Sequence, residues 1–173
     1  ALGPAIGWEE EGHYAMRNLP IQSVQMIYNA LELDPGRALL RTAEETGTSL
    51  LVRVPHSSGM LEGHYTEDTV FAEHDHRRHR PRSWLIEGVR KVEQLRFLEQ
   101  ENRCTLGQAA LQYVLRSPAV VSALPNVYDA GQVDEFAAAP DQISITDAQA
   151  EVIEQLFGAN YGLPVAEPTG VAS

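Results

Sequence analysis

Four consecutive residues, His56, Ser57, Ser58 and Gly59, carry the clearest chemical signal in the sequence. They end an apolar, β-branched run within the stretch SLLVRVPHSSGMLEG, residues 49–63. Hydroxyl groups and backbone N–H groups bind phosphate oxygens, and a glycine lets the main chain approach a ligand closely. The residues alone leave two interpretations open, which are a phosphate-binding loop and a plain connection between a strand and a helix.

Three further histidines, His74, His76 and His79, lie in the segment EHDHRRHR. Their spacing matches no tetrahedral metal signature, and Cys104 is remote in the sequence. We therefore predict no metal site, and we interpret this segment as a solvated loop that contacts substrate. His56 either lines the mouth of an active site or serves as a structural histidine.

The composition is that of one soluble globular domain of 173 residues, with 43% hydrophobic residues and a net charge of −11. Nucleic acids and anionic membrane surfaces are therefore poor partners. Cys104 is the only cysteine, which is usual for a cytoplasmic protein, and we see no targeting or membrane-spanning segment. The first residue is Ala1 rather than Met, which indicates a processed chain or a piece of a longer one.

Apolar runs alternate with helical patterns along the chain. Strands are predicted at 21–29, 49–55 and 119–125, after a strand end at 1–7, and helices at 9–18, 35–47, 83–101 and 105–116. This order predicts an α/β fold with about four parallel strands and outer helices. The apolar character of the strands predicts that both faces of the sheet are covered, with ligands beyond the carboxyl ends of the strands.

Polar pairs with capping-box spacing predict three helix starts. In each pair a side chain at the N-cap position precedes a glutamine by three residues. The pairs are Thr105 with Gln108, Asp129 with Gln132, and Thr146 with Gln149. After Gly162 the chain is predicted to be a mobile tail, residues 163–173.

Five motifs occur in the order seen in the second half of aldo-keto reductases, and residues 1–157 resemble that family. The motifs are SVQMIYNALE, LLVRVPHSSGMLEGHY, FAEHDHRRHRPRSW, TLGQAALQYVL and VSALPNVYDAGQVDEF. The resemblance implies the C-terminal half of a (β/α)8 TIM-type barrel over residues 1–162. The family binds NADPH across the carboxyl ends of its strands.

The resemblance also implies which residues hold the cofactor. Tyr28 would stack on the nicotinamide ring and Gln25 would bond its carboxamide, although Tyr28 also suits a place at the rim of the core. In such barrels the loops after the last two strands commonly form a phosphate site. The resemblance thus implies that the end of the strand at 49–55 and the loop after it would contribute Arg53, Pro55, His56, Ser57, Ser58 and Gly59 to the cofactor site.

The second of these loops departs from the family pattern. Asn126 stands in place of a glycine and tolerates a left-handed backbone, and Gln132 matches a residue near the adenosine. Tyr128 stands where the family has a basic residue that holds the 2′-phosphate. NADP is the cofactor that the resemblance implies, with NAD as the alternative.

The family's catalytic tyrosine, lysine, aspartate and histidine come from the first half of the barrel, so no catalytic residue is predicted here. The only lysine, Lys91, falls inside the predicted helix 83–101. One hypothesis is the C-terminal portion of an NAD(P)H-dependent reductase of a small aldehyde or ketone. The alternative is a non-catalytic half-barrel that binds a dinucleotide or a partner chain. In both cases the exposed strands predict association with the missing N-terminal half or with a second copy.

Overall fold

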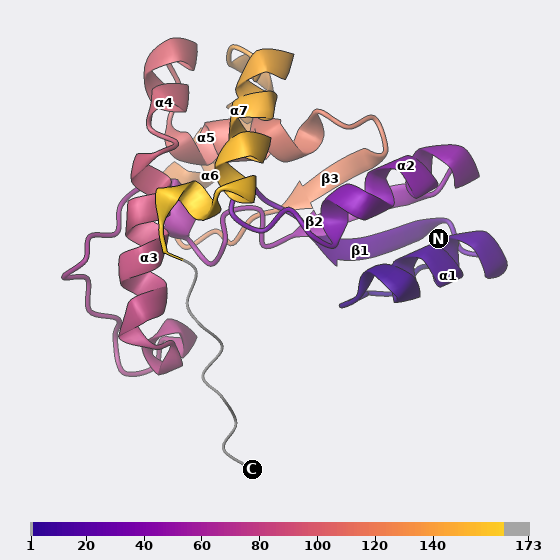
Figure 1. The fold of residues 1–173 in the computed structure, drawn as a ribbon, viewed down its shortest axis with the longest axis horizontal. Coiled ribbons are helices and arrows are strands. Elements are labelled where there is room, and N and C mark those ends of the chain that lie inside the picture. Colours follow the sequence, from indigo (N-terminus) through magenta and orange to yellow (C-terminus); the bar gives the residue numbers. More distant parts are fainter. Residues whose placement is uncertain (1, 165–173) are drawn as a thin grey trace.

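A computed structural model of the chain describes residues 2–164, which form a parallel sheet with helices packed beside it. The strands are β1 (Ser23–Ile27), β2 (Ser49–Arg53) and β3 (Val120–Leu124), and they lie side by side in the order β1-β2-β3 (Figure 1). Each predicted strand at these places is confirmed. All three carboxyl ends therefore lie at the same edge of the sheet.

The prediction of about four strands is wrong for the described residues, which contain three. The first segment makes a single parallel bridge, between Ala5 and Gln25. Two backbone bonds of 2.9 Å support it, from the Gln25 N–H to the Pro4 oxygen and from the Ile6 N–H to the Gln25 oxygen. Pro4 has no N–H to donate, so the pairing does not extend into a ladder.

The sheet is covered fully on one face only, which corrects the prediction of two covered faces. Val24 and Met26 of β1 and Leu50 and Val52 of β2 have no exposed surface, and they form the centre of the hydrophobic core. The alternate residues of both strands are half-buried. Alternation of this kind marks a strand with two different environments, and it places polar residues such as Gln25 on the less covered face.

The helices are α1 (Glu9–Asn18), α2 (Gly36–Thr46), α3 (Arg82–Glu93), α4 (Phe97–Asn102), α5 (Leu106–Leu115), α6 (Ala130–Ala137) and α7 (Asp147–Gly158). Figure 1 shows α1 and α2 beside β1, and α5, which packs on β3 and contacts α6. Short 3₁₀ turns occur at Met60–Glu62, His76–His79, Ala139–Asp141 and Asn160–Gly162. At the end of α2, Gly47 adopts the left-handed conformation (φ 70°) expected of a C-terminal stop.

The single helix predicted over 83–101 is wrong, because the structure divides it into α3 and α4. Between them the backbone N–H groups bond three residues back, for example from Leu95 to the Val92 oxygen at 2.9 Å and from Leu98 to the Leu95 oxygen at 3.0 Å. Side chains three apart eclipse one another in such a tight turn. Val92, Leu95 and Leu98 therefore all enter the core, and each is at most 3% exposed.

Two of the three predicted capping boxes, at Thr105 and Thr146, are confirmed as reciprocal pairs. Asp129 caps α6 as predicted, because its carboxylate accepts a bond of 2.9 Å from the Gln132 N–H. The Gln132 side chain does not return the bond to Asp129. It accepts from the Tyr128 N–H instead, so this pair forms only half of a capping box.

No helix in the stretch from residue 2 to residue 164 combines the length and the apolar character that crossing a membrane requires. Most of the predicted mobile tail, from residue 165 onward, lies outside the described residues.

Replacing Thr105 by alanine tests the start of α5. The Thr105 hydroxyl accepts a bond of 3.1 Å from the Gln108 N–H and donates to the Glu135 carboxylate. We expect Thr105→Ala to lower the free energy of unfolding by about 1 kcal/mol in urea denaturation, because the cap is lost. Thr105→Ser keeps the hydroxyl and should stay close to the parent protein. Equal losses in both variants would show that the cap does not stabilise this helix.

Candidate functional site

The loop that follows β2 has an unusual left-handed backbone. Val54, Ser57 and Ser58 have φ values of 58°, 48° and 60°, and Gly59 continues the turn at 89°. Only glycine adopts this conformation without strain, and each other residue there costs about 1–3 kcal/mol. Strained backbone persists only where surrounding contacts hold it, and such places are often functional.

A buried polar network holds this turn in place. Asn29, just after β1, is completely buried, and its Nδ2 donates to the Val54 oxygen at 3.0 Å and to Glu32 Oε2 at 2.8 Å. The Ser57 hydroxyl donates to the same Glu32 oxygen at 2.9 Å. The loops after β1 and β2 are thus joined at the carboxyl edge of the sheet.

The turn presents two adjacent backbone donors. Among residues 2–164 the N–H groups of Ser58 and Gly59 donate no hydrogen bond, and the Ser58 hydroxyl makes none there either. Successive N–H groups in such a turn form a concavity that binds anions. A side chain at position 59 would lie 2.4 Å from the Tyr65 hydroxyl, so only glycine fits beneath Tyr65.

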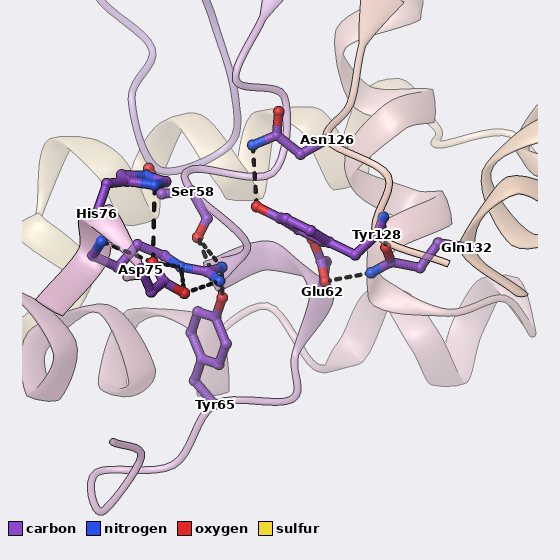
Figure 2. A network of polar contacts seen from close by, with 9 residues as sticks. Ser58, Glu62, Tyr65, Asp75, His76, Asn126, Tyr128 and Gln132 are labelled. Carbon is purple, nitrogen blue, oxygen red and sulfur yellow. Dashed lines mark hydrogen bonds and ion pairs between the residues drawn. The ribbon is translucent and has the colours of Figure 1, made fainter. Parts of the chain in front are cut away.

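An arginine fastens the loop at 64–82 over this turn. Arg77 Nε donates to both carboxylate oxygens of Asp75 at 2.9 and 3.0 Å. Its Nη1 donates to the Ser58 carbonyl oxygen at 3.3 Å and to the Tyr65 hydroxyl. Figure 2 shows Ser58, Tyr65 and Asp75 converging on this point. The Arg77 guanidinium also lies 5.5 Å from the ring centre of Tyr128, which comes from the loop after β3.

Charge and burial shift the pKa values of the groups around the turn. The hydrogen bonds from Arg77 lower the pKa of Asp75 to about 2. Burial raises the pKa of Tyr65 to about 12, and burial also raises the pKa of Glu62. Asp75 therefore stays ionised at neutral pH, while Tyr65 stays protonated.

The loop after β3 meets the same region. Gln132 Nε2 donates to Glu62 Oε2 at 2.9 Å, and Gln132 Oε1 accepts from the Tyr128 N–H at 2.8 Å. The Asn126 amide lies 3.5 Å from the Tyr128 hydroxyl (Figure 2). The structure thus brings Asn126 and Gln132 close to the turn at Ser58, although 68 and 74 positions separate them from it in the sequence.

Two of the residues singled out from the sequence lie in the protein interior. Tyr28 is 5% exposed, and its hydroxyl donates to the Tyr113 hydroxyl at 3.3 Å. His56 is 3% exposed, with Nε2 at 3.0 Å from the Gly107 carbonyl oxygen and its ring against Phe136. Burial lowers the pKa of His56, so its imidazole is neutral at pH 7.

Gln25 and Arg53 are half-buried, and Pro55 is buried between Arg53 and the turn. Arg53 lines a cavity of about 300 Å³ together with Ile27 and Phe157. This cavity lies at the carboxyl ends of β1 and β2, where parallel α/β proteins bind their ligands. The predicted site residues therefore fall into several places. Ser57, Ser58 and Gly59 form the turn, Arg53 lines this cavity, and Tyr28 and His56 lie in the interior. Gln25 lies on β1, and Asn126 and Gln132 follow β3.

The sequence did not point to the residues that hold the turn in place. Asn29, Glu32, Tyr65, Asp75 and Arg77 act through contacts across loops, and only the alternating charges of the segment around Arg77 offered a signal. No group of three His, Cys, Asp or Glu side chains within the described part of the chain is placed to hold a metal ion.

Comparisons with known proteins agree on one family. The sequence model described as "Aldo/keto reductase family" matches residues 11–157. An aldo-keto reductase of Strobilurus tenacellus is 27% identical in an alignment of 144 residues, and the match covers 79% of this chain and 42% of the relative.

Solved structures show the same likeness. The glycerol dehydrogenase of Gluconobacter oxydans matches 99% of this chain and 53% of its own, with a TM-score of 0.75 and 21% identity. An aldo-keto reductase of Bacillus halodurans in its holo form matches 89% and 49%, with a TM-score of 0.65 and 20% identity. The chain thus spans about half the length of these relatives, and its parallel sheet fits a fold of TIM-barrel type.

Replacing Asp75 by asparagine tests whether the ion pair between Asp75 and Arg77 stabilises the loop at 64–82. The carboxylate is stabilised in the folded state, so its contribution is complete above about pH 4 and disappears as the pH falls toward its folded pKa of about 2. We expect Asp75→Asn to cost about 1 kcal/mol at pH 7 in urea unfolding. The difference from the parent protein should shrink between pH 4 and pH 2. Asp68 is a fully exposed aspartate in the same loop, so Asp68→Asn is the matched control. It should change neither the free energy of unfolding at pH 7 nor its dependence on pH.

Proposed function

Because the chain belongs to the aldo/keto reductase family, we propose that it supplies the nicotinamide-cofactor site for the reduction of a small aldehyde or ketone. Membership in this family makes it part of an oxidoreductase that uses a nicotinamide cofactor. The proposal goes further in assigning the cofactor site to this chain. The observation that carries it is the pair of unused N–H groups at Ser58 and Gly59.

The chemistry of the turn fits a dinucleotide at its pyrophosphate. Two neighbouring N–H donors, a free serine hydroxyl and the nearby Arg77 guanidinium suit an anionic oxygen cluster. Gly59 removes the side chain that would otherwise block close approach of the backbone. Tyr65 and Arg77 cover the turn, so they would shift to admit the pyrophosphate.

The remaining contacts are assigned by position. Arg53 and Gln25 face the open side of the sheet, and we assign them to the nicotinamide end of the cofactor. Asn126 and Gln132, from the loop after β3, are assigned to the adenosine end. Tyr28 would have to leave its contact with Tyr113 to stack on the nicotinamide, so we leave it out of the site. When bound, the cofactor supplies the hydride.

Reduction of a carbonyl also needs a proton donor, and the family's tyrosine–lysine pair belongs to the first half of the barrel. In this chain Lys91 lies on α3 with its ammonium 5.7 Å from the ring centre of Tyr161, so it is not free for that role. We therefore propose that a cytoplasmic protein with both barrel halves performs the reaction. The half-buried face of β1 and β2 is the surface on which the other half packs.

Tyr128 bears on the choice between NADPH and NADH. It replaces the basic residue that the family uses for the 2′-phosphate. Arg77, whose guanidinium lies 5.5 Å from the Tyr128 ring centre, is paired with Asp75. We propose NADP as the cofactor, with NAD as the alternative that a titration distinguishes.

Calorimetric titration of the purified protein with NADPH and with NADH tests the proposal. Native mass spectrometry of the same sample shows whether a second polypeptide or a second copy travels with the 19.1 kDa chain. We expect saturable binding of at least one cofactor, and cofactor oxidation with small aldehydes where the other half is present. Binding of neither cofactor by a folded sample would overturn the proposal.

Replacing Ser58 by alanine removes a hydroxyl that has no partner in the described residues. We expect Ser58→Ala to weaken cofactor binding by roughly threefold to tenfold, since one hydrogen bond to the ligand is lost. The free energy of unfolding should stay near that of the parent protein. Ser83→Ala, an exposed serine at the start of α3, is the control and should bind as the parent does. Unchanged affinity in Ser58→Ala would remove this serine from the site.

A further inference from the structure

A separate cavity of about 190 Å³ lies between the loop at 69–82 and the beginning of α3. Apolar side chains line its inner part, namely Phe71 and Trp84, which are half-buried, and Leu85, which is buried. Exposed arginines line its outer part, and these are Arg78, Arg80 and Arg82. The cavity therefore combines an apolar interior with a cationic entrance.

The arginines differ in how far their donors are already used. Arg82 is committed to the loop, because it donates to the carbonyl oxygens of Thr69, at 2.9 Å, and of Glu67. Arg78 lies 3.8 Å from the carboxylate of Glu73, and this distance is too long for a hydrogen bond. The Glu73 side chain is 93% exposed, so it does not hold Arg78 in place.

Arg80 has no carboxylate within 4.0 Å among residues 2–164, and its guanidinium lies 5.3 Å from the ring centre of Trp84. Stacking on an indole ring leaves the in-plane N–H donors of a guanidinium free. Arg78 and Arg80 thus hold unused donors at the entrance of the cavity.

Positive charge is concentrated at the entrance of the cavity, because the carboxylates beside it, Glu73 at 3.8 Å from Arg78 and Asp68 at 3.8 Å from Arg82, are almost fully exposed. Four arginines fall within residues 77–82, in a chain whose net charge is −11. The Asp75 carboxylate is already paired with Arg77. The start of α3 adds positive potential, because Pro81 at its N-cap has no side-chain acceptor to offer the first N–H groups. A local cationic patch on an acidic protein concentrates small anions at one place.

We propose that this cavity binds an organic anion, in which a carboxylate or phosphate group is carried by a flat, apolar body. Arg78 and Arg80 would pair with the anionic group, and Trp84 and Phe71 would pack against the apolar body. Arg77, which lies over the turn at Ser58, also lines this cavity. Arg78 and Arg80 take no part in the proposed cofactor contacts, so variants of these two arginines test the cavity separately from the proposed function.

Tryptophan fluorescence reports on this site directly. The chain has two tryptophans, and Trp8 is 70% exposed before α1, so Trp8→Phe leaves Trp84 as the single emitter. Benzoate and phenyl phosphate serve as anionic probes, and benzyl alcohol is the neutral control. We expect a saturable change in Trp84 emission with at least one anion, weaker at higher salt, and none with benzyl alcohol. The anion that binds more tightly identifies the head group.

Variants of Arg80 and Arg78 locate the binding. Arg80→Gln should weaken the binding of the anion about tenfold or more, because charge-assisted hydrogen bonds are lost. Arg78→Gln should act in the same direction, and Arg80→Lys should restore part of the affinity. Arg41→Gln, on α2 and paired with Glu45 at 2.7 Å, is the matched control. Unfolding midpoints confirm that each variant is folded.

Three results would overturn this proposal. They are the absence of a saturable response to both anions, an equal response to benzyl alcohol, and parent-like affinity in both Arg78→Gln and Arg80→Gln.

Discussion

The hydrogen bonds of Asn29 are the constraint on which the carboxyl edge of the sheet depends. This side chain is fully buried, and both ends of its amide are used. Its oxygen accepts from the N–H groups of Leu31 and Glu32, each at 2.9 Å, and its nitrogen donates to Glu32 and to the Val54 oxygen. A buried amide left without these partners would be costly, so the network fixes the loops after β1 and β2 together.

The left-handed turn depends on this network and on the loop above it. The Glu32 carboxylate accepts a hydrogen bond from the Ser57 hydroxyl, and the Arg77 guanidinium donates one to the Ser58 carbonyl oxygen. These contacts offset the strain of non-glycine residues at positive φ, and they leave the N–H groups of Ser58 and Gly59 without a hydrogen bond to any of residues 2–164. Successive N–H donors that are unused within residues 2–164 suit an anion, and the proposal that this turn binds the pyrophosphate of the cofactor rests on them.

Local sequence patterns predicted the positions of most helices and strands, but they could not predict the contacts between residues far apart in the sequence. Thr105 and Thr146 mark helix starts because a cap depends on residues three positions apart. The break between α3 and α4 was missed because Leu95 and Leu98 fit a continuous helix as readily as a tight turn, and only packing decides between them. The bond between Ser57 and Glu32 joins residues 25 positions apart, so no periodicity reveals it. The burial of Tyr28 against Tyr113 is likewise a tertiary contact.

The measurement that most directly tests the role of the turn is a nuclear magnetic resonance titration of the ¹⁵N-labelled protein with NADPH, followed at the backbone amides. The N–H groups of Ser58 and Gly59 donate no hydrogen bond within the described part of the chain, so a bound pyrophosphate should shift their resonances strongly. We expect the amides of Ser58 and Gly59 to shift in a saturable way, with smaller shifts at Gln132 and Asn126. Saturable binding that leaves the Ser58 and Gly59 amides unchanged would contradict the assignment of this turn to the cofactor.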